Sequence, residues 1–80
     1  MGKDNSELVI EPGLYRHYKG NNYNVLGVGR HSEYDEVFVV YEALYESEYP
    51  YGAIWVRPIE IFIDEVEWEG KLQKRFVKIG

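Results

Sequence analysis

The stretch EVFVVYEALY, residues 36–45, decides the fold class. Its odd positions are uncharged from Val37 to Tyr45, whereas its even positions include Glu36 and Glu42. Because successive side chains of a strand point to opposite faces, this alternation predicts a strand with one apolar face turned toward a core. The side chains expected to face inward are Val37, Val39, Tyr41, Ala43 and Tyr45.

Three further runs rich in β-branched and aromatic residues surround this strand and cover residues 14–19, 23–30 and 53–57. Turn-forming residues separate them, such as Gly20-Asn21-Asn22 before the second run. Two glycines within 23–30 predict a bent or bulged strand. No segment keeps an apolar stripe at helical spacing for about ten residues, so the chain is predicted to be all-β.

The C-terminal third is expected to add smaller elements. Residues 59–62 follow Pro58 and are too few for a regular helix, so we expect a single 3₁₀ turn. Residues 66–69 and 75–79 are expected to form a last hairpin around Gly70. Five or six short antiparallel strands joined by tight loops favour a small closed or half-closed barrel.

The chain has 80 residues, which is enough for one small domain with one core. The turn signal Glu11-Pro12-Gly13 divides it into an N-terminal extension, residues 1–12, and a single domain, residues 13–80. The absence of cysteine excludes disulfides, thiolate nucleophiles and thiolate metal sites. No apolar run approaches the roughly 20 residues of a membrane span, so we expect no membrane partner and a cytoplasmic location.

Charge is unevenly distributed along the chain, whose net charge is −5. Residues 31–69 carry eleven acidic side chains and one basic side chain, Arg57, whereas residues 70–80 carry four basic side chains and no acidic one. The basic tail is expected to pair with the protein's own acidic middle. An acidic protein repels a polyanion, so we expect no nucleic-acid partner.

Several phrases together resemble the small bacterial domain of unknown function numbered 1653, over nearly all of residues 13–79. The resemblance implies a compact bacterial cytoplasmic protein with an SH3-like barrel and no assigned activity. It supplies no catalytic residue. The phrases are Tyr15-Arg16-His17-Tyr18-Lys19-Gly20, Gly29-Arg30-His31-Ser32-Glu33, Val39-Val40-Tyr41, Ala43-Leu44-Tyr45, Trp55-Val56-Arg57-Pro58 and Arg75-Phe76.

Trp55 and Arg57 are the first candidates for a binding site. Alternation along 53–57 puts them together on the less apolar face, opposite Ile54 and Val56. SH3-like barrels commonly hold an extended peptide on aromatic side chains, so we interpret the domain as a non-enzymatic binding module for a peptide segment or small ligand. His17 and Tyr45 complete the predicted ligand-binding set. The competing interpretation is that these rings only complete a small core.

The alternative function is a small enzyme or ligand-processing subunit that uses His17, His31 and Glu33. It requires the three side chains to converge in one pocket. The two histidines do not have metal-ligand spacing, and carboxylates alone are unspecific ligands, so we expect no metal and no cofactor. The expected partner is a protein, a peptide or a small ligand, with the domain a monomer or a weak homodimer.

Overall fold

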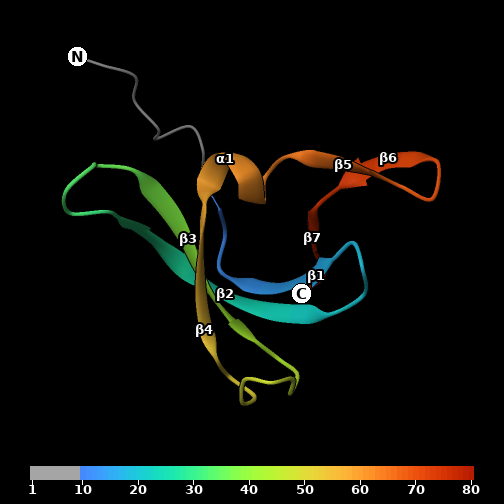
Figure 1. The fold of residues 1–80 in the computed structure, drawn as a ribbon, viewed down its shortest axis with the longest axis horizontal. Helices are drawn as coiled ribbons and strands as arrows, with labels where there is room; N and C mark the ends of the chain where they lie inside the picture. The colour runs from blue at the N-terminus through green and yellow to red at the C-terminus, as the bar shows by residue number, and fades with distance from the viewer. Residues whose placement is uncertain (1–9) are drawn as a thin grey trace.

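The structure is a computed structural model that describes residues 10–80. Its elements follow the chain as strands with one short helix inserted after the fourth (Figure 1). Most of the predicted extension 1–12 therefore lies outside the described residues. The elements are β1 (Gly13–His17), β2 (Asn22–Arg30), β3 (Val37–Ala43), β4 (Ile54–Pro58), α1 (Ile59–Phe62), β5 (Glu65–Trp68), β6 (Lys71–Lys74) and β7 (Phe76–Lys78).

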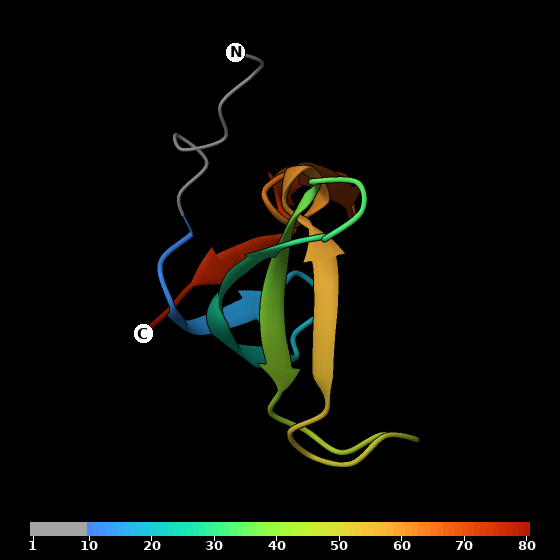
Figure 2. The ribbon, with the colours of Figure 1, turned by 90° about the vertical axis from the view of Figure 1, so that its left-hand side faces the viewer.

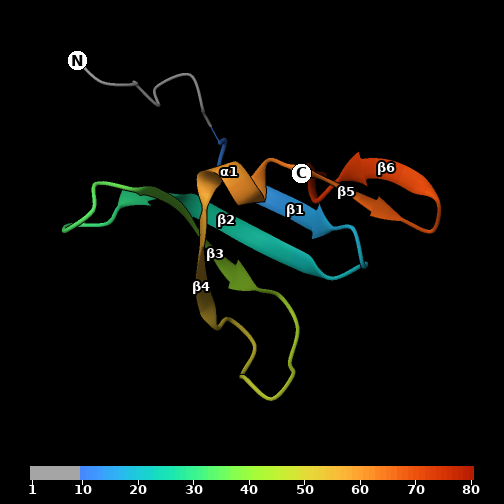
Figure 3. The ribbon, with the colours of Figure 1, turned by 45° about the horizontal axis from the view of Figure 1, so that its top comes forward.

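Five strands form one antiparallel sheet in the order β4-β3-β2-β1-β7, and β5 pairs with β6 in a separate hairpin. The predicted all-β antiparallel architecture is confirmed. The prediction of a closed barrel is wrong, because β4 and β7 end the sheet as edges and do not pair with each other. Figure 3 shows the β5–β6 hairpin extending beyond the twisted sheet instead of closing it.

Two C-terminal predictions need correction. Residues 59–62 form one α-helical turn, not a 3₁₀ turn, because the N–H of Ile63 reaches back four residues to the carbonyl of Ile59 at 3.1 Å. The hairpin around Gly70 pairs β5 with β6, whereas β7 pairs with β1. Arg75 separates these strands because its backbone bonds elsewhere, to the carbonyl of Asp64 and to the amide of Tyr18.

β2 contains the irregularity that its glycines predict. The β2–β3 register shifts between Val25 and Gly27, which leaves Leu26 as the extra residue of a bulge. Gly27 has a φ of 152°, a conformation that side chains with a Cβ rarely adopt. The bulge bends β2 near its middle, as expected for a strand in a strongly curved sheet.

The core lies on one face of the five-stranded sheet and is covered by α1, which packs against the edge strand β7. The predicted inward set of β3 is confirmed from Val37 to Ala43, all of them buried, while Tyr45 lies just beyond the strand and is half-buried. The rings of Phe62 and Phe76 stack with centroids 4.1 Å apart, which fixes α1 against β7. The remaining buried core residues are Tyr15, Val25 and Ile59.

Candidate functional site

The sheet register places Trp55 and Arg57 on the core face of β4. Trp55 lies opposite Tyr41, and Arg57 lies opposite Val39, so all four side chains share one face. Trp55 and Arg57 share a face of β4, as predicted, but this face is turned toward the core and is not the outer, less apolar face that was expected. Ile54 and Val56 point to the outer face of the sheet instead, and each is more than half exposed.

Arg57 is held without a carboxylate partner. Its Nε donates a hydrogen bond to the hydroxyl of Tyr41 at 3.1 Å, and its guanidinium carbon lies 5.4 Å from the centre of the Phe76 ring. Among residues 10–80, no acidic side chain lies within ion-pair distance of Arg57. The guanidinium is therefore fixed by one neutral oxygen and one ring, and its charge is not neutralised by a direct partner.

Two groups of contacting aromatic rings, together called the aromatic strip, extend from the 44–53 loop to the β5–β6 hairpin. Neighbouring rings within it lie mostly edge to face, a favoured arrangement, and Trp55 joins Tyr41 as its cross-strand partner. Its two ends are accessible, since Tyr49 is 47% exposed and Trp68 is 38% exposed. The strip consists of Tyr49, Trp55, Tyr41, Tyr45, Tyr23, His17, Tyr18 and Trp68.

A hydroxyl pair lies in the middle of the aromatic strip. The oxygens of Tyr23 and Tyr45 are 2.6 Å apart and form a hydrogen bond. Burial, together with this bond, raises the pKa of Tyr23. The Tyr23 hydroxyl therefore stays protonated at neutral pH and cannot act as a general base.

His17 lies beside the same cluster. Its ring centre is 5.0 Å from that of Phe76, and its Nδ1 accepts a hydrogen bond from the backbone N–H of Lys19 at 3.2 Å. Burial lowers the pKa of His17, and the positive charges of Arg57, Arg75 and Lys19 lower it further. The imidazole is therefore neutral at pH 7, with its proton on Nε2.

The structure brings together most of the predicted ligand-binding set. His17 and Arg57 both pack on Phe76, and Tyr45 reaches them through Tyr23. Trp55 lies further along the strip, where its ring meets that of Tyr49 at 5.1 Å.

The residues of the alternative enzyme do not converge. His17 ends β1 beside the start of β2, whereas His31 follows the end of β2. Nine extended residues at about 3.3 Å each separate the two histidines by well over 20 Å. The Nδ1 of His31 accepts backbone N–H bonds from Glu33 and Tyr34, so it stabilises a turn. Across residues 10–80, no three histidine or acidic side chains gather in a way that could hold a metal ion.

Sequence reasoning missed a bidentate ion pair at the base of the β5–β6 hairpin. Arg75 donates from Nε to Asp64 Oδ1 at 2.7 Å and from Nη2 to Oδ2 at 3.2 Å. These hydrogen bonds lower the pKa of Asp64. The opposite charges of the tail and the middle segment gave only the general expectation of internal pairing, which Arg75 and Asp64 confirm, and did not indicate these two residues.

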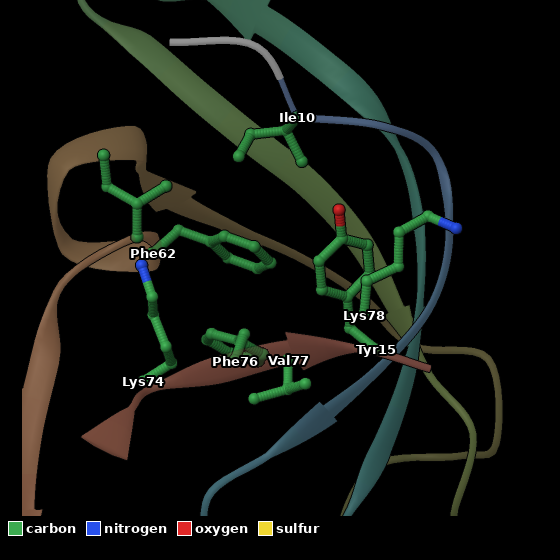
Figure 4. Close-up of a pocket in the computed structure, with 8 residues that line it drawn as sticks. Ile10, Tyr15, Phe62, Lys74, Phe76, Val77 and Lys78 are labelled. Carbon is green, nitrogen blue, oxygen red and sulfur yellow. The ribbon is translucent and has the colours of Figure 1, made fainter. Parts of the chain in front are cut away.

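It also missed an apolar cavity of about 250 Å³ between α1 and β7. Figure 4 shows Phe62 and Phe76 facing each other in its wall, with Lys74 and Lys78 on opposite sides in this view. No periodic signal in the sequence indicated it, because its walls come from five separate segments. Ile10, Tyr15, Ile63 and Val77 complete the lining.

The fold and this face define a small all-β domain with an open antiparallel sheet and an aromatic, arginine-centred inner surface. A family model described as a protein of unknown function, DUF1653, matches residues 13–78, so the chain belongs to the DUF1653 family. It is similar to the crystal structure of a DUF1653 protein from Bordetella bronchiseptica, with 40% identity, a TM-score of 0.79, and coverage of 89% of this chain and 88% of that one. No curated protein matches. Within residues 10–80, no helix has the length and apolar character to cross a membrane.

Proposed function

We propose that this domain is a non-enzymatic binding module whose aromatic strip, centred on Arg57, holds a peptide segment or small ligand bearing an anionic group. We take it to act in the cytoplasm as a monomer or weak homodimer, with an open variant of the SH3-like arrangement. The ligand's apolar or proline side chains lie against Trp55 and Tyr49, while its carboxylate faces the guanidinium.

One observation carries this proposal: Arg57 is fixed by Tyr41 and Phe76 but has no acidic partner among residues 10–80. Arg57 is half-buried, and a partly desolvated charge is stabilised by a direct counter-charge, whereas Asp64 acts on it only through space. An exogenous carboxylate can supply this counter-charge, because the guanidinium fork matches the two oxygens of a carboxylate. The surrounding rings add contact area at low entropic cost.

A displayed library of random linear peptides tests this function. We expect the enriched peptides to share one acidic residue next to an aromatic, aliphatic or proline residue. Arg57→Gln keeps a hydrogen-bond donor but removes the charge, and Trp55→Ala removes one ring of the strip. Each is expected to weaken binding of an enriched peptide at least about tenfold, the loss of roughly 1.4 kcal/mol.

Arg16→Gln is the matched control. Arg16 is an exposed arginine on β1, on the face opposite that of the buried Tyr15 and three strands away from β4. Its removal should leave peptide binding unchanged. Failure to enrich any peptide, or equal losses in Arg16→Gln and Arg57→Gln, would contradict the proposed function.

A further inference from the structure

Strand β4 ends the five-stranded sheet on one side. Figure 2 shows it running alongside β3, with no other described strand on its far side. The backbone groups of an edge strand that point away from the sheet are available to another chain. β4 therefore presents an edge at which a further strand can be added.

The hydrogen-bond alternation identifies which groups point outward. The N–H of Ala43 donates to the carbonyl of Ala53 at 2.9 Å, so this pair is of the hydrogen-bonded type. In an antiparallel ladder such pairs recur at every second residue, so Trp55 and Arg57 turn their backbone groups toward β3. The N–H groups of Ile54 and Val56 then point away from the sheet. Pro58 occupies the next outward position and has no N–H.

The outer face beside this edge is apolar. Ile54 and Val56 are 55% and 57% exposed, and Val40 lies next to Val56 in the sheet. A cavity of about 250 Å³ extends from Val56 over Val40 and Phe38, and Gly29, Arg30 and His31 at the end of β2 complete its lining. β4 carries no lysine or acidic residue that would discourage pairing.

Charge determines which chain fits this edge. Glu46 and Glu48 lie in the loop before β4, and Glu60 follows β4 directly in α1. A second copy paired antiparallel would bring that loop toward the partner's α1 and so place like charges together. A segment with basic residues at both ends instead complements both acidic flanks.

We propose that β4 accepts an extended segment of a partner protein as an added strand. The segment has apolar residues at alternate positions against Ile54 and Val56, an acidic residue toward Arg57, and basic residues at both ends. This inference rests on the proposed function and adds its binding mode. Main-chain hydrogen bonds to Ile54 and Val56 supply affinity, and the two faces of β4 supply specificity.

The probe is a capped heptapeptide with lysine at both ends, valine at the second, fourth and sixth positions, glutamate at the third and threonine at the fifth. On binding, we expect the amide hydrogens of Ile54 and Val56 to exchange at least about tenfold more slowly. N-methylation of the central valine, whose N–H faces β4, should weaken binding about tenfold. N-methylation of the glutamate, whose N–H points away, should have little effect.

Protein variants complete the test. Val56→Thr keeps a β-branched side chain but reduces the apolar contact, so it should weaken heptapeptide binding severalfold. Val77→Thr makes the same change on the other edge strand, where Val77 is 49% exposed, and should have no effect. A second copy as the occupant would appear as a concentration-dependent dimer that protects the same amides without peptide, and would overturn the proposal.

The failures of this inference and of the proposed function are distinguishable. Heptapeptide binding that depends on Arg57 but leaves the Ile54 and Val56 amides unprotected would disprove strand addition and leave the binding module standing. Equal effects of the two N-methylations would do the same. No binding at millimolar heptapeptide also overturns strand addition, whereas the displayed library decides separately whether the module binds peptides at all.

Discussion

Arg57 can serve either the stability of the fold or the binding of a ligand, and a substitution distinguishes these two roles. Arg57 projects from the core face of β4, yet its contacts are a tyrosine hydroxyl and an aromatic ring. We predict that Arg57→Ala lowers the free energy of unfolding by about 1–2 kcal/mol, the scale of one hydrogen bond to a charged group plus a cation–π contact. Removing one partner of a buried ion pair would cost about 3–5 kcal/mol. Urea denaturation measures the difference, and a loss of the larger size would make Arg57 a structural residue.

The stability of the folded domain should depend on pH through His17. The folded protein lowers the pKa of His17, so the unfolded chain, with a pKa near 6.5, binds the proton first as pH falls. The stability contributed by neutral His17 is therefore complete above pH 6.5 and declines below it, until the folded pKa is passed. Urea denaturation at several pH values between 7.5 and 5 checks this.

The control for this pH dependence is His17→Asn. Asparagine keeps an oxygen that can accept the Lys19 N–H but does not titrate. The decline between pH 6.5 and 5 should be smaller in this variant than in the wild type. An identical decline would assign the effect to other groups.

The bulge in β2 can be tested by replacing its two glycines. Gly27 has a φ of 152° and Gly29 does not have a positive φ in that range, although both lie in the same strand. Gly27→Ala should lower the free energy of unfolding by about 1–3 kcal/mol because of backbone strain. Gly29→Ala, whose added Cβ would meet only Val40 Cγ2 at 3.9 Å, should be neutral or slightly stabilising. Similar losses in both variants, measured by thermal or urea unfolding, would contradict this account of the bulge.

The strands that could be predicted are those with local signals. The alternation in 36–45 and the glycines of β2 depend only on neighbouring residues, and both predictions are confirmed. The pairing of β7 with β1 could not be predicted, because it joins residues some 60 positions apart. This pairing also requires a break between β6 and β7 at Arg75. The backbone hydrogen bonds of Arg75 with Asp64 and Tyr18 produce that break.

The site was predictable only in part for the same reason. Alternation placed Trp55 and Arg57 on one face, but which face meets the core depends on the β3–β4 register. The bond from Arg57 to Tyr41 and the stacking on Phe76 combine three strands, β4, β3 and β7. His17 and Tyr45 join this cluster through the same long-range packing. The resemblance to the family did not indicate this packing.

The Asp64–Arg75 ion pair joins the hairpin to the rest of the molecule. It closes the base of β5–β6, where the chain leaves α1 and returns to β7. Because Asp64 is partly exposed, Asp64→Asn should cost only about 1 kcal/mol at pH 7. The lowered pKa of Asp64 means that this stability is present above pH 3.8 and is lost as pH falls through the folded pKa.

The stability difference between wild type and Asp64→Asn should therefore vanish in strong acid, which urea denaturation from pH 7 to 2 can follow. Asp35→Asn is the control, since Asp35 pairs with Arg30 at a far more exposed site and should cost little at any pH. A constant difference between wild type and Asp64→Asn at all pH values would show that the charge of Asp64 is not responsible.

The charge distribution of the whole molecule gives a further prediction. Arg75 is occupied by Asp64, and Lys74 lies opposite Glu65 in the hairpin, so half of the basic tail has acidic neighbours. With a net charge of −5, the domain should show no salt-dependent binding to duplex DNA or RNA. Fluorescence anisotropy with a labelled duplex at 50 and 200 mM salt checks this. Micromolar binding that weakens steeply at the higher salt would contradict it.

The pairing of β1 with β7 has a consequence for how the protein is made on the ribosome. Translation proceeds at about 5–20 residues per second, so Phe76 is synthesised about 3–12 s after its partner His17. During that interval β1 can pair with β2 while its other side has no partner. The nascent chain thus carries an open strand edge at His17, whose packing partner Phe76 is not yet made. Ribosome-bound chains are therefore the form of this protein most exposed to chaperones and to one another.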